Sequence, residues 1–324
     1  MNKITLALST SLLLFFSAFA VGDDRSDWPS SMTVGTSSQG GTYYIYGSGW
    51  ANLINQKLGT NIGAEITGGP VQNVSMVQLG EHDFGLVTMG PALEAIEGKS
   101  PILPGVKHDK VRALFPMYQT IFHISTMKDS AISGVDALEG KRAGVGSAGG
   151  TNSVYWPRFF DLLGYDITTL EGGSGDQAGQ MQDGLLDAFA FGAGLPVSSV
   201  SQLEAQSEIN VFSFPKDDID KIVKEYSEIS RSVVPAGTYR AVTEDIPTVS
   251  IWNFVVVNAD MPESLAYEVV KAVMENHEAM LKVHRSAAET IPENVIYNTQ
   301  IPFHPGAVRW FEENGYDIPD ELKG

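Results

Sequence analysis

The chain of 324 residues contains no cysteine, which excludes a disulfide framework and a lipid anchor attached to an N-terminal cysteine. Basic residues are also scarce, because 21 Lys and Arg stand against 39 Asp and Glu, and the formal net charge is −18. A surface this acidic argues against nucleic acid and anionic lipid as partners. It does not exclude an anionic small ligand, since backbone dipoles can bind an anion inside an acidic protein.

Most catalytic and metal-binding motifs are missing as well. The sequence has no G-x-S-x-G nucleophile elbow, no Walker loop and no H-E-x-x-H pair, so we predict no metal site and no cofactor. One segment, residues 144–149, matches the dinucleotide pattern G-x-G-x-x-G. It keeps open an alternative hypothesis, a secreted α/β enzyme that uses the turn at Gly146 as an oxyanion or phosphate site. That hypothesis lacks a His–Asp pair for Ser147.

Long apolar runs are absent except at the N-terminus. Lys3 precedes a mostly apolar stretch at residues 4–19, and Ala18 and Ala20 fit the small-x-small cleavage rule. The stretch is shorter than the roughly 20 residues that span a bilayer. We therefore predict a cleavable signal peptide at residues 1–20 and a mature protein free in the periplasm, not a lipoprotein.

Two glycine-rich turns are the most informative feature that is present. Residues 35–44 read GTSSQGGTYY and residues 144–152 read GVGSAGGTN, and each lies between a predicted strand and a predicted helix. Such a turn presents unpaired backbone N–H groups at the positive end of a helix dipole. Two of them, about 110 residues apart, suggest two lobes that each present an anion-receptive helix N-terminus to a shared cleft.

The chain alternates between strand and helix patterns, which is typical of an α/β protein with mostly parallel sheets. After the signal peptide it suits two domains of roughly 150 residues each. We predict lobe I at 28–121 plus 250–324 and lobe II at 122–249, because the pattern restarts near residue 120. Predicted strands are 32–35, 64–67, 84–88, 111–115, 121–126, 141–145, 187–192, 210–214 and 249–257, and predicted helices are 43–57, 71–79, 152–163, 197–206, 217–226, 262–284 and 305–314.

Several segments together resemble the solute-binding components of tripartite ATP-independent periplasmic (TRAP) transporters of the TAXI type. They occur in that family's order and cover nearly all of the mature chain: 40–44, 67–73, 80–85, 138–146, 235–239 and 302–307. The resemblance implies a type II-like periplasmic binding protein, with two sheets flanked by helices and a cleft between lobes. It also implies a small carboxylate ligand, such as glutamate, 2-oxoglutarate or another dicarboxylate, and delivery to a TRAP membrane subunit. We expect a monomer and no enzymatic activity.

The predicted site follows from the two turns. The N–H groups of residues 147–152 would bind the ligand carboxylate, with Thr42 and Tyr43 closing from the other lobe. Tyr43 and Phe191 are the preferred aromatic walls because each adjoins a glycine-rich loop, and Gln119 lies at the first predicted crossing between lobes. No arginine can be assigned as a clamp. The predicted ligand-binding residues are Gly41, Thr42, Tyr43, Gly69, Val71, Asn73, Thr88, Gln119, Ser147, Gly149, Gly150, Thr151, Asn152, Phe191 and Gly192.

Overall fold

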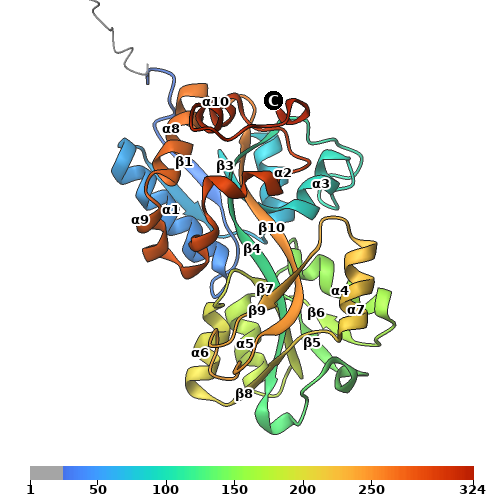
Figure 1. Ribbon diagram of the computed structural model, residues 1–324. Helices are drawn as coiled ribbons and strands as arrows, with labels where there is room; N and C mark the ends of the chain where they lie inside the picture. Colours follow the sequence, from blue (N-terminus) through green and yellow to red (C-terminus); the bar gives the residue numbers. More distant parts are fainter. Residues whose placement is uncertain (1–24) are drawn as a thin grey trace, which may run out of the picture.

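The computed structural model describes residues 25–324 (Figure 1). The predicted signal peptide at residues 1–20 lies outside the described part. Within residues 25–324, no helix combines the length and the apolar character that crossing a bilayer requires.

A sheet of ten strands runs through the described chain. Eight strands follow the order β2-β1-β3-β10-β4-β7-β5-β6, while β8 pairs with β4 and β9 pairs with β10. Their bounds are β1 Met32–Gly35, β2 Ile62–Glu65, β3 Phe84–Thr88, β4 Val111–Met127, β5 Arg142–Gly144, β6 Thr168–Leu170, β7 Ala188–Ala193, β8 Ile209–Phe212, β9 Ser230–Val234 and β10 Ile246–Asn258.

Strands β4 and β10 are the long central strands, and they pair antiparallel with each other. The strands predicted at 111–115 and 121–126 are one continuous strand, β4, so that separation was wrong. The predicted two sheets are joined through β4 and β10 into one hydrogen-bonded sheet. The sheet is also mixed, not mostly parallel, because β10 runs antiparallel to β3, β4 and β9, whereas β1 and β5 each have two parallel neighbours.

Ten α-helices of the described chain flank this sheet. They are α1 Thr42–Leu58, α2 Pro70–Leu79, α3 Met89–Ile96, α4 Thr151–Leu163, α5 Ser174–Gln182, α6 Ser198–Gln206, α7 Lys216–Glu225, α8 Glu263–Met274, α9 His277–Val283 and α10 Pro305–Glu313, with short 3₁₀ segments η1 Lys128–Ser130, η2 Val135–Leu138, η3 Arg285–Glu289, η4 Pro292–Tyr297 and η5 Asp320–Leu322. Figure 1 shows two groups of elements. We call β1–β3, α1–α3 and α8–α10 lobe I, and β5–β9 and α4–α7 lobe II. Strands β4 and β10 run through both.

Two helix predictions need correction. The helix predicted at 262–284 is divided into α8 and α9, because Asn276 has φ −123° and ψ 38° and leaves the helical region. Helix α3 was missed, since Gly90 and Pro91 near its start look like helix breakers. Pro91 lies in the first turn, where the missing N–H loses no intrahelical bond. The short β6, α5 and β9 were also missed.

Helix α1 shows how the sequence pattern sets the packing. The predicted apolar face of Tyr46, Trp50, Leu53 and Ile54 is buried, as the spacing of three and four residues indicated. Trp50 packs edge-on against Phe84 of β3, with ring centroids 5.0 Å apart. This packing places the N-terminus of α1 at the edge of lobe I that faces lobe II.

Candidate ligand-binding site

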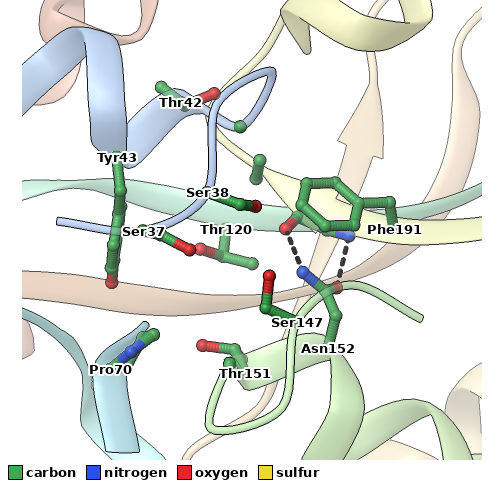
Figure 2. Close-up of a pocket in the computed structure, with 14 residues that line it drawn as sticks. Ser37, Ser38, Thr42, Tyr43, Pro70, Thr120, Ser147, Thr151, Asn152 and Phe191 are labelled. Carbon is green, nitrogen blue, oxygen red and sulfur yellow. Dashed lines mark hydrogen bonds between the residues drawn. The ribbon is translucent and has the colours of Figure 1, made fainter. Parts of the chain in front are cut away.

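Two helices begin at the same cavity, one from each lobe. Helix α1 starts after Gly41 and helix α4 starts after Gly150, and no side chain caps either helix. The first-turn N–H groups of a helix have no acceptor within the helix, and they carry its positive dipole end. The two glycine turns that the sequence singled out therefore meet in space, and both helix starts contribute to the cavity lining (Figure 2).

The cavity is small and uncharged. Its volume is about 40 Å³, which is room for roughly three waters by the same measure. None of the described residues around it has a formal charge at neutral pH. The lining consists of Ser37, Ser38, Gly41, Thr42, Tyr43, Pro70, Thr120, Ser147, Gly150, Thr151, Asn152, Phe191, Gly192 and Ala193.

Nine of the residues predicted from the sequence line this cavity: Gly41, Thr42, Tyr43, Ser147, Gly150, Thr151, Asn152, Phe191 and Gly192. Asn152 is held against β7, because its Oδ1 accepts from Gly192 N at 2.5 Å and its Nδ2 donates to Gly192 O at 2.9 Å. Figure 2 shows these two bonds and places the side chains of Ser37, Thr120 and Ser147 between Tyr43 and Phe191.

Five lining residues were missed. Ser37 and Ser38 lie in the first glycine turn, and their position in that turn could have predicted that they line the cavity. Pro70, Thr120 and Ala193 adjoin predicted residues, but neighbouring positions do not show which side chain faces the cavity. In a strand, consecutive side chains point to opposite faces, and the assignment of faces requires the sheet.

Several predicted residues lie beside the cavity and serve the framework. Asn73 is fully buried, and its Nδ2 donates to the carbonyl oxygens of Thr36 and Leu86, so it holds β3 and the residue that follows β1 to α2. The hydroxyl of Thr88 bonds that of Thr151 at 2.7 Å. The predicted residues outside the lining are Gly69, Val71, Asn73, Thr88, Gln119 and Gly149.

Gln119 requires the largest correction. It lies within β4, not before a strand, and it faces a separate cavity of about 180 Å³. Its side-chain Nε2 donates to Glu289 Oε1 and its backbone N donates to Glu289 Oε2, both at 2.7 Å. The next residue, Thr120, points to the opposite face and lines the cavity between the helix starts.

The lobes are in direct contact around the cavity. Ser199 N of lobe II donates to the carbonyl oxygen of Gly40, and Val71 N of lobe I donates to that of Gly149. Arg158 of α4 forms an ion pair with Glu94 of α3 at 2.5 Å. The structure thus shows a closed arrangement, in which atoms of both lobes surround the cavity.

The dinucleotide-like segment has a structural use. The backbone N–H of Gly146 donates to Gln177 Oε1 at 2.7 Å, so it is not available to a phosphate or an oxyanion. The Ser147 hydroxyl has a long contact, 3.5 Å, to the carbonyl oxygen of Gly172. No histidine is among the described residues that line the cavity. Residues 25–324 also contain no group of three His, Asp or Glu side chains that could bind a metal ion.

Comparison with known proteins gives a consistent fold. The NMT1-like family matches the chain over residues 34–315. The periplasmic binding protein BugD is similar at 12% identity, covering 90% of this chain and 99% of its own, with a TM-score of 0.58. MatC from Rhodopseudomonas palustris with bound malate is similar at 13% identity, and the match covers 88% of this chain and 99% of MatC, with a TM-score of 0.57. An R. palustris protein with adipate is similar at 17% identity, and the match covers 79% of this chain and 87% of that protein, with a TM-score of 0.54. At these identities the likeness shows the fold, and the predicted two-lobed α/β fold of periplasmic binding proteins is confirmed.

Proposed function

The chain belongs to the NMT1-like family, and from this premise we propose that it is an extracytoplasmic solute-binding protein for a small carboxylate. The ligand is bound between the lobes and is delivered to a transporter membrane component, which the TAXI-like motifs suggest to be that of a TRAP system. The structural neighbours include the periplasmic binding protein BugD and MatC with bound malate, and the comparisons support a substrate-binding transport protein and not an enzyme. The hypothesis of a secreted enzyme is therefore wrong.

The observation that carries this proposal is the meeting of two uncapped helix N-termini at an uncharged cavity. Each hydrogen bond from a backbone N–H to a carboxylate contributes about 1.5–3 kcal/mol. Three or four such bonds, after the cost of association, are enough for a Kd near 1 μM, about −8 kcal/mol. An arginine clamp is not required for this affinity.

The proposed lobe boundaries lie within β4 and β10, at 121–122 and 249–250. They are supported by a change of partners along β4, which pairs with β7 only from Ile121 onward. Both boundaries fall on the paired segment of the two long strands, where Ser250 lies opposite Ile121. Opening and closing of the lobes would bend this two-stranded connection, a hinge motion of the kind that closes binding proteins around ligands.

The mature protein, residues 21–324, provides the test. Glutamate, 2-oxoglutarate and other dicarboxylates are screened for a rise in melting temperature, since a ligand at 100 times its Kd stabilises the fold by about 2.7 kcal/mol. Mass spectrometry of ligand released from freshly purified protein identifies the natural solute. The absence of both a shift and a released carboxylate contradicts the proposal.

A matched pair of glycine variants links binding to this cavity. A Cβ at Gly41 would lie 3.5 Å from the Ser38 carbonyl oxygen and 3.7 Å from the Phe191 ring, so G41A adds a methyl group to the cavity without a clash. G63A adds a methyl group with no atom within 4 Å. We expect G41A to weaken ligand binding by about tenfold or more and G63A to leave it unchanged.

A further inference from the structure

Asn253 of β10 connects the two long strands to helix α1, and it is fully buried. Its Nδ2 donates to the backbone carbonyl oxygen of Tyr118 at 2.5 Å. A carbonyl oxygen can only accept, so the nitrogen must face Tyr118 and Oδ1 must face the other side. There Oδ1 lies 2.6 Å from the Tyr43 hydroxyl and 3.1 Å from the Thr120 hydroxyl.

This orientation fixes the protons of two cavity-lining hydroxyls. An amide oxygen has no proton to give, so Tyr43 and Thr120 both donate to Asn253 Oδ1 and fill its two lone pairs. Burial raises the pKa of Tyr43 well above its usual value, so the phenol keeps its proton at neutral pH. Thr42 likewise donates its hydroxyl proton to the carbonyl oxygen of Gly194. All three hydroxyl oxygens can still accept a hydrogen bond.

Besides the hydroxyls of Ser37, Ser38, Ser147 and Thr151, which can donate or accept, the cavity has two chemically different parts. The starts of α1 and α4 provide N–H donors, which suit a carboxylate. The oxygens of Tyr43 and Thr120 provide acceptors only, which suit an N–H or O–H group of the ligand. A ligand that presents a carbonyl oxygen to these hydroxyls would leave lone pairs facing each other.

Resting on the proposed function, we propose that the ligand is a carboxylate that also carries an amino or hydroxyl group, and that Asn253 is the positioning residue that selects it over the 2-oxo analogue. The cavity volume of about 40 Å³ favours the shorter acids, and a ligand the size of glutamate requires the lobes to stand further apart than in this closed arrangement. The absence of an acidic side chain from the described lining suits a donor whose charge is balanced by the ligand's own carboxylate, or a neutral hydroxyl.

The first test uses ligand series that differ at one group. Glutamate, 2-hydroxyglutarate and 2-oxoglutarate form one series, and alanine, lactate and pyruvate form another. Calorimetric titration of the mature protein should show that the amino or the hydroxy acid of a series binds at least about tenfold more tightly than its 2-oxo analogue. Whichever of the amino acid and the hydroxy acid binds more tightly shows whether the ligand's hydrogen-bond donor is an amino or a hydroxyl group. Equal or tighter binding of the 2-oxo acid overturns this inference while leaving the proposed function intact.

The second test changes the acceptors. T120V and Y43F each remove one acceptor and should weaken binding of the preferred acid by about tenfold, with a much smaller effect on the 2-oxo acid. T120S keeps the hydroxyl and should retain the preference. Y46F is the matched control for Y43F, because the Tyr46 hydroxyl bonds Thr290 and does not line the cavity.

The third test addresses Asn253 itself. N253A frees the protons of Tyr43 and Thr120, so both hydroxyls can donate and the preference should shift toward the 2-oxo acid. If Asn253 had a merely structural role, N253A would weaken the binding of all ligands equally. The ratio of the Kd values of the preferred acid and its 2-oxo analogue would then stay unchanged. If N253A does not fold, T120V and T120S decide the question. They remove or keep the Thr120 hydroxyl that Asn253 orients, while Asn253 itself is unchanged. The inference is contradicted if T120V has the same ratio of Kd values for the preferred acid and the 2-oxo acid as wild type.

Discussion

The hydroxyl of Thr42 donates a 2.6 Å hydrogen bond to the backbone carbonyl oxygen of Gly194. Thr42 is the first residue of α1 in lobe I, and Gly194 follows β7 in lobe II. The bond is buried and joins the two lobes beside the cavity. A residue that the sequence indicated as a ligand contact thus also holds the closed arrangement.

Removing this bond should weaken ligand binding through closure. T42V leaves the Gly194 carbonyl without a partner in the closed arrangement, at a cost of about 1–2 kcal/mol. Because the open arrangement does not make the bond, the cost appears as a five- to thirtyfold rise in Kd. T42S keeps the hydroxyl and should stay near wild type. Small-angle scattering should show less compaction of T42V at a given ligand concentration, and equal compaction of both variants would contradict this role.

A steric change at Gly68 should block closure directly. A Cβ at Gly68 would lie 2.2 Å from the carbonyl oxygen of Ala148 in lobe II, a distance that real Cβ atoms do not show. Each lobe can fold without this contact, so G68A should reduce affinity and compaction while changing stability little. G63A, whose added methyl group meets no atom within 4 Å, is the control. Normal ligand affinity in G68A would show that the lobes need not approach this closely.

Glu289 should stabilise the connection between the lobes. It accepts two hydrogen bonds from Gln119, one from the backbone N–H of a strand that pairs with β7 only from Ile121 onward. E289A leaves that N–H without its acceptor and should cost about 1–3 kcal/mol in the free energy of unfolding. Urea denaturation measures the loss. The control is E275A, at an exposed position, whose free energy of unfolding should be within about 0.5 kcal/mol of wild type. An equally small change in E289A would contradict the role assigned to Glu289.

Stability should fall on mild acidification because of His123. Its Nδ1 donates to the Ile121 carbonyl oxygen and its Nε2 accepts from the Tyr239 hydroxyl, both at 3.2 Å. Burial lowers the pKa of His123 to about 4. Between pH 6.5 and 4 the unfolded state therefore binds a proton that the folded state does not. The free energy of unfolding should decrease as pH falls through this window, by about 2–3 kcal/mol at pH 4.5.

The variant H123Q isolates that contribution, because glutamine can still bond and does not titrate. Burial also lowers the pKa values of His108, His284 and His304, so wild type and variant must be compared at the same pH. We expect their difference in urea-unfolding free energy to shrink between pH 7.5 and 4.5. A pH-independent difference would show that the pKa of His123 is the same in the folded and unfolded states, which contradicts the lowered value.

The sequence by itself determined the local elements and the two helix starts. Apolar spacing identified the buried face of α1, and the glycine turns identified the N-termini of α1 and α4, because backbone freedom and hydrophobic periodicity act within a few residues. The same patterns misjudged β4 as two strands, since Pro116 looks like a strand breaker and Gln119 and Thr120 are polar. The place of these polar residues within the strand depends on pairing with β10 and on the Gln119–Glu289 hydrogen bonds, whose partners are distant in sequence.

Only the tertiary structure decided how the site is assembled. Gln119 and Thr120 are neighbours in the chain, yet they face different cavities, because the sheet places opposite faces of β4 against different segments. Asn253 gave no sequence signal, since its importance arises from Tyr43, Tyr118 and Thr120 meeting around one amide. Local patterns determine which elements form, but the direction of each hydrogen bond at the cavity depends on partners that only the folded chain brings together.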